Sequence, residues 1–228
     1  GITELPELLK KWKKRGLYLK HLIQEKEMFL KKNKKKLLYF FILIFLVNIK
    51  LVNASENKKF FQEKIYDYLS NTDSFSSNFL QASGKTIEEG SIYIDDKRIR
   101  VEYLKPSKIR IIMNNKKVMY FNIDLQEVEY FNPKESIAEI FYNIFYSSEF
   151  IKKSKVKNKK SFVVLEREVE VEGGKTHIHI FFEKQPFILR KIQIKRPNEV
   201  LSFGLFNIDH NSVFDEGFFS MVNPMIIK

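Results

Sequence analysis

The sequence predicts a mainly β protein with helices, an α+β chain whose antiparallel sheet is strongly curved or forms an open barrel. Three observations indicate this class. Apolar and polar residues alternate with a period of two over much of residues 75–206, and two segments have helical spacing instead. The chain also carries 22 Phe and 10 Tyr against 8 Gly and 6 Pro. Its 228 residues suffice for one domain with a core of its own.

Residues 28–54 have the three parts of a secretory signal peptide. Five lysines between positions 31 and 36 precede an apolar run over residues 37–47, and Ala54 closes a segment suited to cleavage before Ser55. We therefore expect export and a mature domain over 55–228. The run is shorter than the roughly 20 residues that a membrane span needs, so an uncleaved anchor over 37–47 is the alternative. Residues 1–27 are expected to be an upstream extension or a basic amphipathic helix.

Charge and cysteine content exclude several classes of function. The net charge is +12, but residues 1–54 contribute +9 of it, with 13 basic and 4 acidic residues. The remainder is almost balanced, so no basic domain face for nucleic acid is expected. The chain has no Cys. That absence excludes disulfides, thiolate metal sites, a Cys nucleophile and a lipidated amino-terminal Cys.

The mature domain begins with a predicted helix over 55–69. Phe61, Ile65, Tyr68 and Leu69 form one apolar stripe on it. A meander of antiparallel strands follows, because charged and apolar residues then alternate. Asn114 and Asn115 are expected to form a tight turn with positive φ. The strands of this first series are predicted around residues 92–94, 99–103, 109–113, 118–121 and 128–131.

A second helix is predicted after Pro133, where apolar residues recur at helical spacing from 137 to 145. The basic stretch 152–160 is expected to be a solvated loop or an edge strand. Gly173 and Gly174 predict a hairpin between two of the strands that follow. These later strands are expected over 162–165, 176–182, 188–194 and 200–206. The helices are expected to cover one mouth of the curved sheet or open barrel.

Candidate catalytic or metal-binding residues are scarce. His177 and His179 lie two apart on a predicted strand and share a face, but no third ligand follows from their spacing. Alternating glutamates from Glu166 to Glu172 fit a solvated strand face. Glycine-rich, nucleophile-elbow and zinc-protease motifs are absent from the sequence. We therefore expect no enzyme, no cofactor and no metal.

The order of several short motifs resembles the LolA family, the periplasmic carriers of outer-membrane lipoproteins. That family's pattern runs roughly S-x-F-x-Q, E-G and a strand, F-R-W-x-Y-x-x-P, two strands joined by a D-G-K turn, L-x-Q-V, and a closing F-x-F-x-x-P. The corresponding segments here are 77–81, 89–94, 100–106, 111–122, 125–128 and 218–224. Val101 stands at the Trp position. Asp95, Asp96 and Lys97 replace a Lys-Arg-Pro segment whose Arg helps to hold the family's lid.

The resemblance implies an unclosed antiparallel β-barrel with a helical lid over an apolar cavity. It also implies a periplasmic monomer that carries lipoproteins from the inner to the outer membrane. Its partners would be acylated lipoproteins, an inner-membrane lipoprotein-releasing transporter and an outer-membrane acceptor. That acceptor is itself lipidated on a Cys, so this Cys-free chain resembles the soluble carrier.

We predict two sets of site residues and leave two other functions open. The inner strand face of the lipid-binding cavity is predicted to comprise Ile92, Ile94, Ile99, Val101, Tyr103, Ile109, Ile111 and Met113. The lid helix is predicted to present Ile137, Ile140, Phe141, Ile144 and Phe145. One alternative is a periplasmic lipid-sensing or protein-interaction module on the same half-barrel. The other is a membrane-tethered β domain without a transported ligand.

Overall fold

The computed structural model describes residues 57–134 and 136–226, together with Lys20, Gln24, Lys36 and Tyr39. Contacts group Asn57–Lys228 into one compact unit. The expectations for residues 1–27, for the signal peptide at 28–54 and for an anchor at 37–47 fall on segments that lie outside the described residues, apart from those four positions. Among the residues that are described, no helix has the length and apolar character to cross a membrane.

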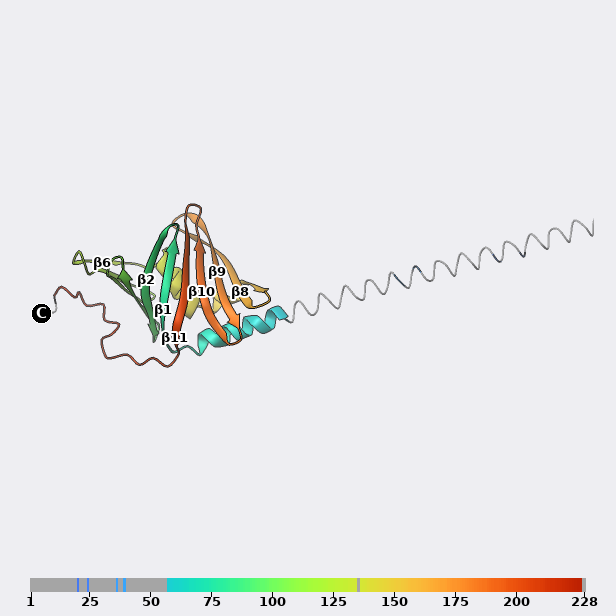
Figure 1. Ribbon diagram of the computed structural model, residues 1–228, viewed down its shortest axis with the longest axis horizontal. Helices are drawn as coiled ribbons and strands as arrows, with labels where there is room; N and C mark the ends of the chain where they lie inside the picture. Colours follow the sequence, from blue (N-terminus) through green and yellow to red (C-terminus); the bar gives the residue numbers. More distant parts are fainter. Residues whose placement is uncertain are drawn as a thin grey trace, which may run out of the picture. The chain divides into compact units, whose positions relative to one another are not determined.

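A single antiparallel sheet forms the body of the domain (Figure 1). It has 11 strands in the order β6-β5-β4-β3-β2-β1-β11-β10-β9-β8-β7. Two meanders therefore meet where β1 pairs with β11, and β6 and β7 remain as edges, which confirms the predicted unclosed sheet. The strands are β1 Ser74–Ser83, β2 Thr86–Asp95, β3 Arg98–Lys105, β4 Ile109–Met113, β5 Val118–Asn122, β6 Glu127–Phe131, β7 Lys155–Asn158, β8 Phe162–Val171, β9 Gly174–Lys184, β10 Phe187–Lys195 and β11 Val200–Asp209.

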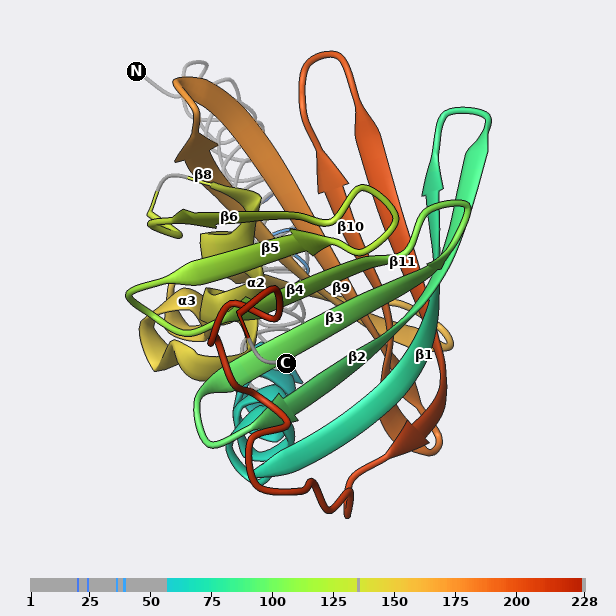
Figure 2. The ribbon, with the colours of Figure 1, turned by 90° about the vertical axis from the view of Figure 1, so that its left-hand side faces the viewer.

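Helices pack on the concave face of this sheet. Residues 57–70 are helical, as predicted, and Ile65 and Leu69 of their apolar stripe are buried. Helices α2 (Ile137–Tyr146) and α3 (Ser148–Lys152) lie behind β3–β6 in Figure 2. Their buried residues belong to one core cluster with side chains from both meanders. The amide of Gln62 ties the first helix to α3 by donating to the Ile151 carbonyl, with Nε2 3.0 Å from the oxygen.

A carboxy-terminal strap, residues 211–226, crosses the convex face over β2, β3 and β4 (Figure 2). Phe219 of the strap packs with Ile112 and Met119 in a second, smaller core cluster. Successive strand residues face opposite sides, so Ile112 points away from its neighbours Ile111 and Met113. The strap explains why Ile112 is nevertheless only 1% exposed.

One local expectation needs revision. The turn after β4 is not a two-residue turn with positive φ. The Asn114 N–H donates to the Lys117 carbonyl over 3.1 Å, and the Asn114 side-chain oxygen accepts two backbone N–H groups. Two consecutive residues with positive φ occur instead in the hairpin between β2 and β3, at Asp96 and Lys97, with φ of 43° and 59°, and again in the hairpin between β8 and β9, at Glu172 and Gly173. The basic stretch 152–160 contains β7, an edge strand, as one of its two interpretations predicted.

Candidate binding cavity

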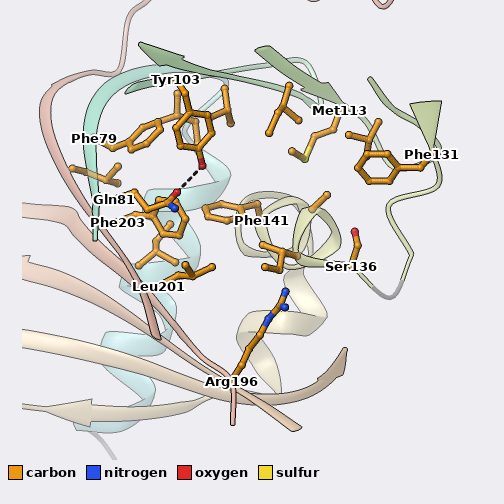
Figure 3. Close-up of a pocket in the computed structure, with 18 of the residues that line it drawn as sticks. Phe79, Gln81, Tyr103, Met113, Phe131, Ser136, Phe141, Arg196, Leu201 and Phe203 are labelled. Carbon is orange, nitrogen blue, oxygen red and sulfur yellow. Dashed lines mark hydrogen bonds between the residues drawn. The ribbon is translucent and has the colours of Figure 1, made fainter. Parts of the chain in front are cut away.

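A cavity of about 360 Å³ lies between the concave face of the sheet and the first turns of α2 (Figure 3). Fourteen of the described residues that line it are apolar. The other five, which carry polar atoms, are Gln81, Tyr103, Ser136, Glu172 and Arg196. A concave apolar space with a few placed polar groups is the usual form of a site for a small apolar ligand.

The predicted inner strand face divides between this cavity and the adjoining core. Ile94 and Ile99 are buried in the core cluster rather than along the cavity. Ile109 pairs with Tyr103 across β3 and β4 and so shares its face, but it is half-buried and lies outside the cavity lining. The five predicted residues that line the cavity are Ile92, Val101, Tyr103, Ile111 and Met113.

The predicted lid stripe divides in the same way. Ile137 and Phe141, four residues apart, line the cavity. Ile140, Ile144 and Phe145 are buried in the core. Side chains four apart lie above one another on a helix, so the helical period places Ile140 and Ile144 on a neighbouring stripe, whereas Phe145 follows Phe141 on the cavity stripe one turn beyond the cavity lining. One narrow stripe of α2 therefore covers the cavity, and the other fastens the helix to the sheet.

Part of the wall comes from residues that the sequence reasoning did not assign to the site. Leu201, Phe203 and Leu205 alternate along β11 and all line the cavity. The Phe203 ring contacts the Phe141 ring edge to face, with centroids 5.0 Å apart. The alternation over 200–206 predicted the strand. It carries no information about the pairing with β1 that brings this strand beside the first meander.

Four of the five polar residues of the wall form two groups at separate places, and the fifth, Ser136, donates its hydroxyl to the Pro133 carbonyl (Figure 3). The Tyr103 hydroxyl donates to the Gln81 side-chain oxygen over 2.6 Å, and the Gln81 amide donates to Glu88 over 2.8 Å. Burial, with a smaller contribution from the charge of Glu88, raises the pKa of Tyr103 well above its ordinary value. Tyr103 therefore stays a neutral donor. The second group is Arg196, whose Nη1 lies 3.2 Å from Oε2 of Glu172.

The histidine pair lies away from this cavity. His177 and His179 are on the face of β9 opposite to the buried Ile178 and Ile180. His179 Nε2 lies 3.9 Å from Glu166, and burial lowers the pKa of His179 although that carboxylate opposes the effect. Within 57–134 and 136–226, no three His, Asp or Glu side chains gather as a metal-binding group.

The described domain is thus an unclosed antiparallel half-barrel with an apolar cavity under a helix. The model of one family, described as "Outer membrane lipoprotein carrier protein LolA", matches residues 70–222. The chain belongs to the LolA family, as its motifs predicted. Proteins of this family are periplasmic lipoprotein carriers rather than enzymes.

Three solved structures have similar chain traces at low sequence identity. A conserved uncharacterized protein from Thermus thermophilus gives a TM-score of 0.46 at 9% identity, covering 67% of this chain and 88% of that one. A DUF1329 family protein from Desulfovibrio piger gives 0.44 at 8% identity, covering 70% and 96%. The MucA/MucB complex of Pseudomonas aeruginosa gives 0.41 at 11% identity, covering 69% and 60%. No curated protein matches the sequence.

Proposed function

We propose that the protein is a periplasmic carrier that holds the acyl chains of lipoproteins in this cavity and shuttles them from the inner to the outer membrane. The observation that carries the proposal is the cavity itself, about 360 Å³ with fourteen apolar side chains in its described lining, in a LolA-family chain. Its volume falls within the range of roughly 300–1,000 Å³ that is typical of ligand pockets.

The hydrophobic effect explains why such a carrier is needed. Each buried CH₂ contributes about 0.8 kcal/mol, so a chain of about 15 carbons costs on the order of 10 kcal/mol to expose to water. A lipoprotein therefore leaves a membrane very slowly unless another apolar site receives the chain. Val101, Ile111 and Met113 on the sheet and Ile137 and Phe141 on α2 would supply that site here.

Loading would require α2 to move away from the sheet, because Phe141 lies against Phe203 across the cavity. An inner-membrane lipoprotein-releasing transporter would drive this step, and an outer-membrane acceptor with higher affinity would take the cargo. Export by the signal peptide over 28–54, with a mature chain from Ser55, is part of the same proposal.

Photo-crosslinking from the two faces of one strand tests the proposal. Phe131 lines the cavity, and its neighbour Tyr130 points to the opposite face of β6; the two residues are 43% and 40% exposed. A photo-crosslinking amino acid at Phe131 or Phe141 should label acylated lipoproteins in cells, and the same residue at Tyr130 should not. Equal labelling from both faces of β6 would contradict the cavity as the cargo site. Labelling by free lipid alone would favour a lipid-sensing module.

A further inference from the structure

One basic side chain faces the apolar cavity among the residues that the structure describes. Arg196 follows β10, and its guanidinium points from that end of the sheet toward α2 (Figure 3). Its side chain is 23% exposed, and its Nε atom is removed from water. A desolvated cation is costly unless hydrogen bonds replace that water.

The interactions of Arg196 satisfy part of its guanidinium. Nη1 pairs with Oε2 of Glu172, from the hairpin between β8 and β9, over 3.2 Å. The Nε–H group is buried from solvent and has no acceptor within the described part of the chain. A guanidinium carries five N–H donors in a planar fork, so Arg196 retains donors for a further acceptor.

We propose that Arg196 anchors the oxygen-bearing head of the acyl ligand, with the hydrocarbon chain extending into the cavity. The acceptor is the carbonyl oxygen of an acyl ester or amide, or the carboxylate of a free fatty acid. Either acceptor forms a charge-assisted hydrogen bond with a guanidinium. The contact is directional when two N–H groups of the guanidinium bond to the ligand head, as they do with the two oxygens of a carboxylate. This inference rests on the proposed function, since it assigns a role within the same site.

The other polar group of the wall, Tyr103 with Gln81, indicates the direction in which the ligand lies. Tyr103 and Gln81 already bond to each other, and the Gln81 amide also donates to Glu88. They offer little to a ligand head, and the wall between them and Arg196 is apolar. The head therefore lies at Arg196, and the chain runs past Phe141 and Phe203 toward Phe79.

Glu172 affects how strongly Arg196 binds an anionic ligand head. Its side chain is 59% exposed, and its carboxylate neutralises part of the charge of Arg196 in the empty protein. An anionic head must share the guanidinium with this carboxylate. The substitution Glu172→Gln removes the competing charge, so it should raise the affinity for a fatty acid more than the affinity for a neutral ester.

Fluorescence titration of the purified full chain with cis-parinaric acid and with its methyl ester tests the anchor. Arg196→Met should weaken binding of at least one probe by about tenfold, the expected loss for one charge-assisted hydrogen bond. Arg190→Met is the matched control. Arg190 is on β10, the strand that Arg196 follows, and pairs with Glu183 over 2.8 Å, but it lies outside the cavity lining. It should change neither affinity by more than about twofold, because a surface ion pair contributes little.

Each outcome of the titration decides the proposal. Loss of affinity for both probes identifies a carbonyl anchor, and loss for the acid alone identifies a carboxylate anchor. Wild-type affinities for both probes in Arg196→Met would overturn the anchor and leave the acyl cavity standing. Failure of the wild-type protein to bind either probe would instead overturn the acyl site, and the anchor with it. If Arg196→Met does not fold, Arg196→Gln removes the charge but keeps a polar side chain, and unchanged affinities for both probes there overturn the proposal equally.

Discussion

Gly90 occupies a position in β2 where a side chain has no room. A Cβ atom there would lie 2.4 Å from the Glu102 carbonyl oxygen of β3 and 2.4 Å from the ring of Phe79. The Phe79 ring takes the space that a side chain would fill and forms part of the cavity wall. It also contacts the rings of Tyr103 and Phe203, with centroids 5.3 and 5.9 Å away. The glycine therefore shapes the cavity without touching a ligand.

Gly90→Ala should destabilise the protein by about 1–3 kcal/mol, because backbone and a packed ring must both move to admit the methyl group. Gly204→Ala on β11 is the control, since its Cβ would meet only the Leu80 carbonyl oxygen at 3.9 Å. That change should be neutral or stabilise the fold by up to about 1 kcal/mol, through the reduced entropy of the unfolded chain. Urea denaturation measures both, and equal stabilities would contradict this account of Gly90.

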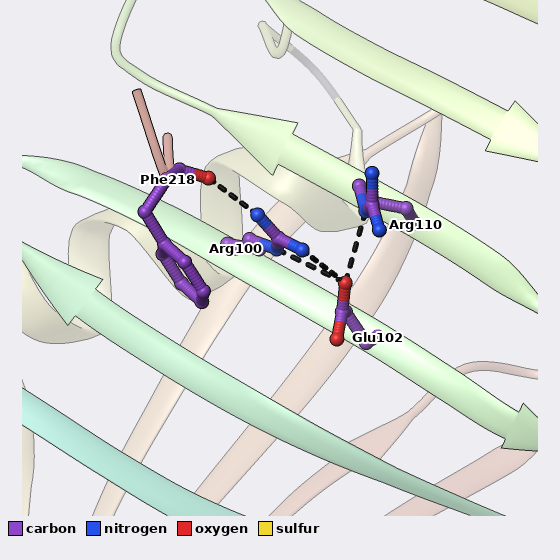
Figure 4. A network of polar contacts seen from close by, with 4 residues as sticks. All are labelled: Arg100, Glu102, Arg110 and Phe218. Atoms are coloured by element: carbon purple, nitrogen blue, oxygen red, sulfur yellow. Dashed lines mark hydrogen bonds and ion pairs between the residues drawn. The ribbon is translucent and has the colours of Figure 1, made fainter. Parts of the chain in front are cut away.

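At the scale of elements, an ion network fastens the carboxy-terminal strap to the sheet (Figure 4). Arg100 of β3 donates to Glu102 and to the Phe218 carbonyl, and Arg110 of β4 donates to the same Glu102 oxygen over 2.9 Å. The guanidinium carbon of Arg100 also lies 4.0 Å from the centroid of the Phe218 ring. The strap thus depends on charges carried by two neighbouring strands.

This network predicts a loss of stability in acid. Burial of Glu102 raises its pKa, but the hydrogen bonds and charges of Arg100 and Arg110 outweigh that effect and hold the pKa below its ordinary value of 4.5. A carboxyl group with a lowered folded-state pKa contributes stability above the unfolded-state value and loses it as the pH falls. The free energy of unfolding should therefore decrease below about pH 4.5.

Glu102→Gln should remove this part of the pH dependence, and Glu129→Gln, on the exposed edge strand β6, should preserve it. Chemical denaturation between pH 6 and pH 3 gives the comparison. A wild-type slope in Glu102→Gln would mean that other carboxyl groups carry the acid sensitivity.

Sequence patterns predicted those helices and strands whose hydrophobic periodicity is visible within the segment itself. Alternation over 99–103 and 109–113 gave β3 and β4, and helical spacing over 137–145 gave α2. The short helix α3 was not predicted, because five residues are too few to show a period. The strap was matched to a family motif, but its place on the convex face depends on contacts with distant residues such as Ile112.

At the scale of the whole molecule, one concave apolar face serves as both core and cavity wall. Near the first helix it is filled by Ile65 and Leu69, and under the first turns of α2 it remains open. The sequence was enough to assign every second residue of a strand to this face, since side chains alternate along a strand. It could not separate Ile94, in the core, from Ile92, in the cavity, because that boundary depends on where the helices lie.

The long-range pairing of β1 with β11 is a second reason why the sequence alone did not identify all residues of the cavity wall. It brings Leu201 and Phe203 into the wall, and it places the end of β10 with Arg196 at the cavity. Arg196 stands between a strand and Pro197, in a setting that suits any solvated turn. Only the folded sheet shows that this cation faces an apolar space.

The most direct test of the central claim, that the cavity carries lipoprotein acyl chains, is mass spectrometry on protein purified from its own cells without detergent. Both the intact complex and an organic extract are measured. We predict a mature chain that begins at Ser55 with an acylated polypeptide bound to it. A chain that keeps residues 28–54 and carries no acyl group in either measurement would contradict the carrier and leave a tethered β domain.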